Sequence, residues 1–197
     1  MQRSIKLRLD QPLPAGDWDE IVLAIGLDSE VEDFPESSER IRLALPVYTP
    51  EPDFNRLRNL VKALLRKGYS RWECSDLATL RMLKTLGVTE ISADWSLNAF
   101  NSQALALLRE LGIKRFTASP ENNLENLVYL KESGYEIDFL VQQSTPLFIS
   151  LHRPAAEVKD LSVYPWGRLW ITTRPVPRTF EVPSEVPTRI DLSWDPA

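Results

Sequence analysis

The chain has 197 residues, a net charge of −5 and a hydrophobic content of 43%. This length suits one well-buried domain with room for a small appendage, and the acidic balance argues against a protein that binds nucleic acid through bulk positive charge. No segment approaches the roughly 18 apolar residues of a membrane span, and no apolar signal region is readable at the N-terminus. The single cysteine, Cys74, excludes an intrachain disulfide, and we expect a cytoplasmic protein.

The first 40 residues differ in pattern from the rest of the chain. Residues 4–9 alternate apolar and polar side chains and residues 20–27 form an apolar run, which predicts two short strands. Residues 28–40 are acidic and almost free of large apolar side chains, which indicates a linker or an exposed loop. We therefore expect residues 1–40 to form a small β element followed by an acidic linker.

A regular alternation of strands and helices begins at residue 41. Short apolar segments predict strands, and apolar positions at helical spacing followed by glycine predict helices. The expected strands cover residues 41–48, 71–74, 90–93, 114–118 and 136–141, and the expected helices cover residues 54–65, 77–86, 102–111 and 124–130. A period of roughly 20 to 30 residues is the size of one βα unit, and repeated units imply a parallel sheet with right-handed crossovers.

These five strands predict a partial (β/α) barrel of the TIM type over residues 41–150. A full barrel of eight units typically needs about 250 residues, more than this segment offers. A partial barrel would leave unpaired strand edges near residues 41–46 or 139–141, and the isolated chain would then associate. Residues 151–197 are rich in proline and predict a tail that packs on the barrel, with strand-like pieces at 168–173 and 189–194.

Polar side chains follow the expected strands at the end where parallel α/β sheets bind ligands. Asp94 and Glu121 are candidates for a general base and a general acid, because two carboxylates held close together split their pKa values. Nearby amides and hydroxyls would bind the substrate: Ser96, Asn98, Asn101, Ser119 and Gln143. The alternative is structural, since Asp, Ser and Asn after a strand commonly cap the next helix, as we expect of Asp76 and of Asn98 or Asn101.

Cys74 and His152 are the only cysteine and the only histidine. A buried structural thiol is the simplest interpretation of Cys74, and a Cys–His hydrolase pair would require these two residues to meet in space. The spacings HExxH and CxxC and the glycine-rich phosphate loops are absent from the sequence. We accordingly expect no bound metal.

Two further groups of residues allow a nucleic-acid interpretation beside a structural one. The basic side chains on or near the helix 54–65 form either a solvated face or a contact to an RNA backbone: Arg56, Arg58, Lys62, Arg66, Lys67 and Arg71. The tryptophans either pack in the core or offer stacking surfaces: Trp72, Trp95, Trp166, Trp170 and Trp194.

Residues 92–127, SADWSLNAFNSQALALLRELGIKRFTASPENNLENL, resemble the peptidase U32 family of collagenase-like proteins. Members commonly show D-x-S-L-N-x-x-N-S, then a helix with G-x-x-R, then S-P/L-E. These positions correspond to Asp94, Ser96, Leu97, Asn98, Asn101, Ser102, Gly112, Arg115, Ser119 and Glu121. The resemblance covers roughly residues 40–195 and implies a TIM-type fold.

The sequence departs from the family pattern in two places. Many members carry a cysteine-rich run that holds an iron–sulfur cluster, whereas residues 140–150 read LVQQSTPLFIS, so we expect no cofactor. The strands that begin the family barrel would precede residue 41, so the chain resembles the C-terminal part of a longer member. The expected partners are therefore the missing N-terminal half of the barrel, a second copy of the chain, or RNA, and no membrane.

The resemblance indicates membership of the family, but it does not identify the reaction, because members of the family have different activities. Some members of the family are called proteases, and others take part in RNA base hydroxylation or in ubiquinone synthesis. We expect this chain to bind, or to help modify, an RNA or small-molecule substrate at the C-terminal strand ends. A catalytically inactive binding or scaffold remnant of a longer U32 protein is the alternative, and a true protease comes third.

Overall fold

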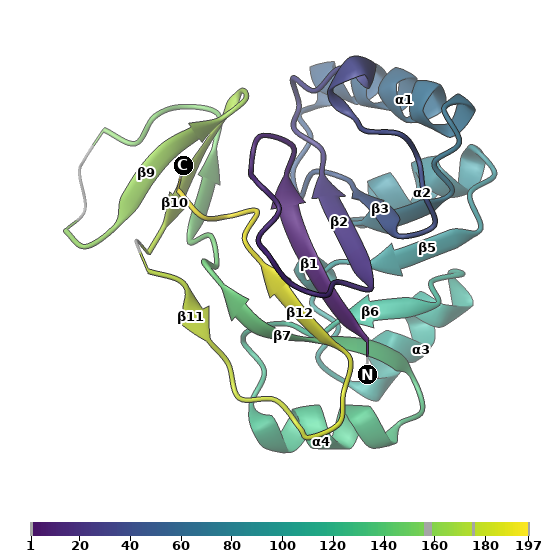
Figure 1. Ribbon diagram of the computed structural model, residues 1–197, viewed down its shortest axis with the longest axis vertical. Coiled ribbons are helices and arrows are strands. Elements are labelled where there is room, and N and C mark those ends of the chain that lie inside the picture. The colour runs from purple at the N-terminus through teal and green to yellow at the C-terminus, as the bar shows by residue number, and fades with distance from the viewer. Residues whose placement is uncertain (1, 156–158, 175, 197) are drawn as a thin grey trace.

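Eight parallel strands form a closed barrel in a computed structural model that describes residues 2–155, 159–174 and 176–196 (Figure 1). The strands follow one another around the barrel in the order β7, β12, β1, β2, β3, β4, β5 and β6, and β6 pairs again with β7. Their bounds are β1 Arg3–Arg8, β2 Glu20–Ala24, β3 Ile41–Ala44, β4 Arg71–Cys74, β5 Glu90–Ala93, β6 Arg115–Thr117, β7 Glu136–Gln143 and β12 Thr188–Asp191. The short strand β11, Arg178–Thr179, pairs antiparallel with β7.

The expected partial barrel is wrong, although its five strands are present and parallel. The expected N-terminal β element supplies β1 and β2, and the expected tail supplies β12. Strand β1 pairs with β12 on one side and with β2 on the other, so segments from the two ends of the sequence close the barrel. Strand β3 lies between β2 and β4, and β7 between β6 and β12, so the predicted unpaired edges are absent there. The reason for expecting association through those edges is thereby removed.

Helices cover one side of the barrel (Figure 1). They are α1 Glu51–Arg66, α2 Leu77–Thr85, α3 Ser102–Glu110 and α4 Leu124–Glu132, with short 3-10 helices η1 Val31–Asp33 and η2 Trp95–Leu97. Helices α2, α3 and α4 are capped at their N-termini by Asp76, Asn101 and Asn123, respectively. Each of these side chains accepts a hydrogen bond from a backbone N–H in the first turn of its helix. The main hydrophobic core lies between the strands and these helices and includes Leu64, Leu83, Trp72, Phe116 and Ile137.

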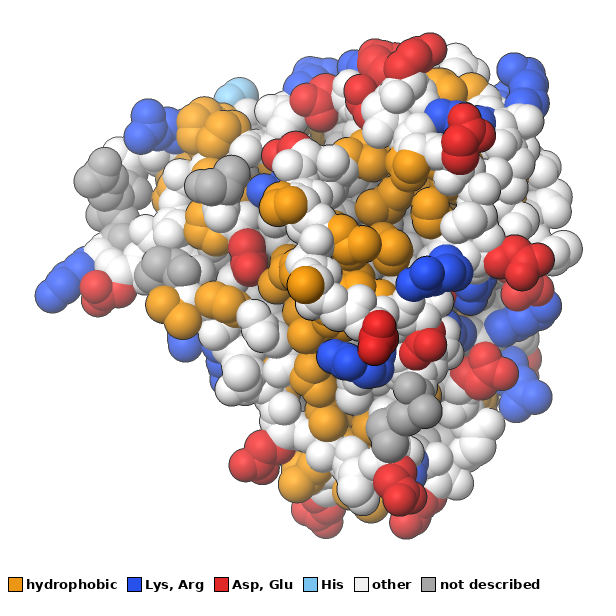
Figure 2. Space-filling view, viewed as in Figure 1, with side chains coloured by type: hydrophobic (Ala, Val, Ile, Leu, Met, Phe, Trp, Pro, Cys, Tyr) orange, Lys and Arg blue, Asp and Glu red, His pale blue; other side chains and the backbone are white. Residues whose placement is uncertain are grey.

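The opposite side of the barrel is covered by a loop in place of a helix. Trp18, in the connection between β1 and β2, packs against Ile5 and Leu7 of β1. Ile190 and Leu192 of the β12 segment are partly buried against the same cluster. Figure 2 shows hydrophobic side chains gathered on this face of the molecule. No helix of the described residues is long and apolar enough to cross a membrane.

A separate antiparallel sheet lies over the C-terminal end of the barrel. Its strands are β8 Phe148–Ser150, β10 Leu169–Thr173 and β9 Ser162–Trp166, in that order. Leu169 and Ile171 of β10 form one cluster with Leu27, which follows β2, and with Trp194, which follows β12. Trp95, directly after β5, packs on the same cluster. The sheet therefore covers the end of the barrel at which this fold usually binds its ligands.

Candidate functional site

The interior of the barrel is charged. Lys6 Nζ of β1 lies 2.9 Å from Glu73 Oε1 of β4, and Arg189 Nη1 of β12 lies 2.5 Å from Glu73 Oε2. Arg115 Nη1 of β6 lies 3.0 Å from Glu20 Oε2 of β2. Strands β12 and β4, and likewise β6 and β2, lie opposite each other around the barrel, so these contacts pass through its interior. Such an interior is ordinarily filled by Val, Ile and Leu.

Each charge of this network has at least one oppositely charged partner. Asp138 Oδ2 lies 2.9 Å from Arg189 Nη2, and Arg42 Nε lies 3.1 Å from Glu20 Oε1. Burial alone would raise the pKa of Glu73, but Arg189 and Lys6 hold that pKa well below its ordinary value. A buried ion pair gives little net stability relative to an apolar pair, whereas losing one partner is costly. We therefore expect the network to favour the one arrangement in which these strands face each other.

Asp94 lies at the end of this network that is nearest the covering sheet. Its side chain is buried just after β5, with Oδ1 at 3.1 Å from Lys6 Nζ. Burial raises the pKa of Asp94 to about 6, the neighbouring carboxylates of Glu73 and Asp191 add to the rise, and Lys6 opposes it. A carboxyl group with such a pKa suits proton transfer near neutral pH. The other catalytic candidate, Glu121, is exposed and lines a small cavity of about 90 Å³ with Arg174 and Arg178.

Three of the predicted substrate-binding residues stabilise local backbone structure. Asn101 caps α3 by accepting the N–H of Ala104, and the exposed Asn98 ends η2 with a left-handed φ of 51°. Ser96 Oγ donates to the carbonyl of Ser75 at 2.8 Å. The structural alternative therefore describes what the side chain of Asn101 does.

The other two predicted binding residues are buried near the ends of their strands. Gln143 Nε2 donates to Asp191 Oδ2 at 2.7 Å, and Gln143 Oε1 accepts from Thr145 Oγ1 at 2.9 Å. Ser119 Oγ accepts from the N–H of Glu121 at 3.3 Å. The structure thus places Asp94 and Gln143 beside the charged interior, while Asn98, Asn101 and Glu121 are exposed.

Cys74 and His152 have different environments. Cys74 is fully buried in the main core, and burial raises the pKa of its thiol. His152 is exposed beyond β8, and among the described residues no hydrogen bond joins the two side chains. Within the same residues, no group of three or more His, Cys, Asp and Glu side chains could hold a metal ion.

The charged interior was not anticipated from the sequence, although the sequence carries a signal for it. One charged residue stands between apolar neighbours in several of the strands, as in I-K-L around Lys6, W-E-C around Glu73 and I-D-F around Asp138. Alternating side chains point to opposite faces of a strand. A strand with one apolar face against helices and one charged face predicts a polar barrel interior.

Buried polar atoms without a hydrogen-bond partner are concentrated at the C-terminal end of the barrel. Among the described residues, all but one of these atoms belong to the connection after a barrel strand or to β10, and the exception is Asp53 Oδ2 in the first turn of α1. Examples are Thr49 Oγ1, Trp95 Nε1, Asn122 Nδ2, Thr173 Oγ1 and Trp194 Nε1. Asp94 Oδ1 has only its ion pair with Lys6. Such atoms are few in native proteins and commonly mark the position of a water or a ligand.

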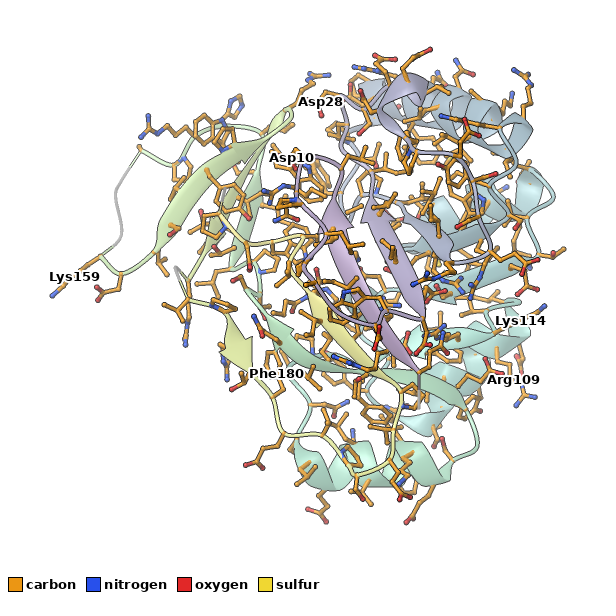
Figure 3. All side chains as sticks on the ribbon, in the orientation of Figure 1. Asp10, Asp28, Arg109, Lys114, Lys159 and Phe180 are labelled. Carbon is orange, nitrogen blue, oxygen red and sulfur yellow. The ribbon has the colours of Figure 1, made fainter. Side chains whose placement is uncertain are left out.

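A cavity of about 430 Å³ opens at this end, between the barrel and the turn that joins β9 to β10. It is lined by Arg8, Leu9, Asp10, Ala24, Gly26, Asp28, Ser29, Asp33, Pro165, Trp166 and Gly167. Figure 3 shows Asp10 and Asp28 along this seam. The volume lies in the range of small-ligand sites.

A sequence model of peptidase family U32 matches residues 26–153, nearly two thirds of the chain. The chain belongs to peptidase family U32. A solved structure described as "The Structure of the U32 Peptidase Mk0906" is similar with a TM-score of 0.51 and 15% sequence identity, over 73% of this chain and 70% of that chain. This likeness supports the U32 fold and no more. No curated protein matches the chain.

The U32 match leaves part of the charged interior outside its bounds. Lys6 and Glu20 precede residue 26, and Arg189 and Asp191 follow residue 153. The interior ion pairs therefore join the segment matched by the family to the two segments that close the barrel.

Proposed function

We propose that this U32 protein binds single-stranded RNA on the face of the sheet β8–β10–β9 that points away from the barrel. The observation that carries the proposal is the combination, on that face, of the exposed Phe148, the partly buried Trp170 and nearby basic side chains. Proteins that bind single strands combine aromatic stacking surfaces with positive charge, and several of them use one face of a sheet.

Strand register determines which side chains share the outward face. Thr172 of β10 is directly opposite Phe148 of β8 and Val163 of β9, and Trp170 is opposite Ser150 and Pro165. The alternate residues Leu169 and Ile171 pack toward the barrel, so Phe148 and Trp170 point away from it. The side chain of Phe148 is 68% exposed.

Basic side chains flank these aromatic rings. The guanidinium of Arg153 lies 5.5 Å from the ring centre of Trp170. Arg178 and Phe180, whose guanidinium and ring centre are also 5.5 Å apart, belong to the neighbouring β11 segment that pairs with barrel strand β7. Arg174, directly after β10, is exposed. Figure 2 shows basic and hydrophobic side chains beside one another on this lobe, and Figure 3 places Lys159 at its outer tip.

The charge of the protein is divided between this sheet and the rest of the chain. Residues 144–180 contain five Lys or Arg and two Asp or Glu, a net charge of +3. The whole chain has 23 Lys or Arg and 28 Asp or Glu, so the remainder carries 18 against 26, a net charge of −8. The overall acidity therefore does not argue against a local contact with phosphates.

The basic residues on or near helix α1 are the other candidate for an RNA contact, but several of them bond to groups within the protein. Arg56 pairs with Glu30 at 2.6 Å, and Arg71 pairs with the buried Glu20 at 2.6 Å. Lys67 donates to the carbonyl of Phe34 at 2.6 Å. These contacts support the structural interpretation of α1 and favour the sheet as the RNA surface.

The test is fluorescence anisotropy of a short labelled single-stranded RNA titrated with the protein at several salt concentrations. We expect Phe148→Ala and Trp170→Ala each to weaken binding about 5- to 150-fold, since one base–aromatic stack contributes about 1–3 kcal/mol. Arg174→Ala should reduce the slope of log affinity against log salt by about 0.7. Tyr129→Ala is the matched control, because Tyr129 is an exposed aromatic residue on α4.

Two results would overturn the proposal. One is the absence of RNA binding by the unchanged protein at low salt. The other is an equal loss of affinity on substituting Tyr129 and Phe148. Hydrolysis of casein that survives Cys74→Ala and chelation but is lost in Glu121→Gln would favour a peptidase. If the protein neither binds RNA nor cleaves casein, the scaffold alternative is favoured.

A further inference from the structure

We infer that the cavity between the barrel and the β9–β10 turn binds a small organic cation, a compound with an ammonium or guanidinium group. This site is separate from the proposed RNA surface. It lies between the β9–β10 turn and the barrel, whereas the RNA surface is the face of the sheet that points away from the barrel. Its lining comes from three segments that the fold brings together: the end of β1, the connection after β2 that contains η1, and the β9–β10 turn.

Arg8 is the only basic residue among the described residues that line the cavity, and its charge is already neutralised. Arg8 Nε lies 3.1 Å from Asp10 Oδ1, and Arg8 Nη1 donates to the carbonyls of Ser193 at 3.0 Å and Asp195 at 2.8 Å. The Arg8 side chain is buried. An anionic ligand would therefore have to break existing contacts of Arg8.

The carboxylates of Asp28 and Asp33 carry the excess charge of the cavity. Among the described residues neither forms an ion pair, and both residues are exposed. Asp33 Oδ2 accepts one hydrogen bond, from the N–H of Glu30 at 2.7 Å. These side chains do not belong to a metal-binding group of the described residues, so an organic cation suits them better than a metal ion.

Glycine at two positions allows the carboxylate of Asp28 to lie in the wall of the cavity. A Cβ atom at Gly167 would lie 2.4 Å from Asp28 Oδ1, and a Cβ atom at Gly26 would lie 2.9 Å from it. Gly167 also has a φ of 57°, which favours glycine. The β9–β10 turn can approach the loop after β2 only because these side chains are absent.

Aromatic side chains form another part of the wall. The ring of Trp166 packs edge to face on Trp194, with ring centres 5.2 Å apart. The face of an indole ring attracts a cation. Behind it, Trp194 is 1% exposed and supports the Trp166 ring without lining the cavity itself. An amide of a basic amino acid supplies a cation of this kind without a free carboxylate, which the side chains of Asp28 and Asp33 would repel.

The experiment is calorimetric titration of the full chain with argininamide and, as a neutral analogue of the same shape, citrullinamide. We expect argininamide to bind and citrullinamide to bind at least about tenfold more weakly, because a hydrogen bond to a charged group contributes more than a neutral one. Asp28→Asn keeps the shape of the side chain and should weaken argininamide binding about tenfold or more. Asp17→Asn is the matched control, since Asp17 is exposed and does not line the cavity.

A second pair of variants separates this inference from the RNA proposal. Phe148→Ala should leave argininamide binding unchanged, and Asp28→Asn should leave RNA binding unchanged or stronger. Thermal unfolding of each variant shows whether it is folded. Equal binding of the two amides, no binding of argininamide, or an unchanged affinity in folded Asp28→Asn would each overturn the inference.

Discussion

The interior of the barrel and its C-terminal end are both rich in polar side chains, but in the described part of the chain the buried polar atoms that lack a hydrogen-bond partner lie mostly at the C-terminal end. Inside, the single side chain of Arg189 donates hydrogen bonds to three residues, Glu73, Asp138 and Thr117. At the C-terminal end, Thr173 Oγ1 and Trp194 Nε1 are buried with no partner among the described residues. Satisfied buried networks specify one arrangement of the chain, whereas unsatisfied groups are available to water or ligands. The comparison is consistent with a structural role for the interior, and it supports our proposal that binding takes place at the end.

The largest effect should come from removing the central cation of the interior. In Arg189→Met, Glu73 and Asp138 lose a buried partner, so we expect the free energy of unfolding to fall by about 3–5 kcal/mol. Urea denaturation followed by tryptophan fluorescence measures this. A loss below about 1 kcal/mol would show that the interior charges do not act as a connected network.

The next effect is a pH dependence that originates from Asp94. Burial raises the pKa of Asp94 from 3.8 to about 6, so the folded state binds this proton more tightly than the unfolded state. The contribution of Asp94 to stability is therefore fully present below pH 4 and is lost as the pH rises through about 6. Relative to Asp94→Asn, the unchanged protein should lose roughly 2 kcal/mol of unfolding free energy between those limits. A constant difference between the two proteins in urea denaturation at each pH would contradict this assignment.

A smaller effect is expected when a buried threonine is replaced by valine, once in the barrel interior and once at its C-terminal end. Thr117 Oγ1 accepts from Arg189 Nη1 at 2.9 Å, so Thr117→Val should lower the unfolding free energy by about 1–3 kcal/mol. Thr173 is equally buried, but its hydroxyl has no partner among the described residues. Thr173→Val should therefore change the unfolding free energy by less than about 0.5 kcal/mol. Equal losses in denaturant titrations would show that the C-terminal end is satisfied as well as the interior.

The smallest effect is expected at an exposed ion pair. Lys114 and Glu90 form a pair on the surface, with the Lys114 side chain 61% exposed. Lys114→Ala should lower the unfolding free energy by only about 0–1 kcal/mol, and added salt should reduce even that difference. The same urea denaturation, carried out at low and high salt, provides the reference for Arg189→Met. A salt-independent loss of several kcal/mol at Lys114 would remove the distinction between buried and exposed pairs.

The sequence predicted the individual elements better than their assembly. Periodicity and glycine stops predicted strands that begin at or within one residue of β3 to β7, and helices that overlap α1 to α4. It also predicted the strands now numbered β1, β2, β10 and β12, because each is a short apolar or alternating run. The error was to treat the two ends of the chain as appendages, since local pattern does not show which strands pair.

The candidate site shows the same limit. Position after a strand drew attention to Asp94 and Gln143, which the structure places beside the charged interior, but it did not separate them from Asn101, which caps a helix. The partner of Asp94 is Lys6, which lies far away in the sequence. A cavity whose wall includes both Asp28 and Trp166 likewise depends on two segments that no local pattern relates.

The sequence by itself determined that this is an α/β protein of the U32 family with parallel βα units, because those features follow from local periodicity, turn residues and a continuous motif. Only the tertiary structure decided that the barrel closes, because closure depends on β1 pairing with β12 across nearly the whole chain. It likewise decided that the interior is ionic, that a basic, aromatic sheet covers one end, and that a cavity lies beneath its turn. Each of these depends on which side chains from distant segments share one low-dielectric or solvent-exposed region, and that is a property of the packed chain.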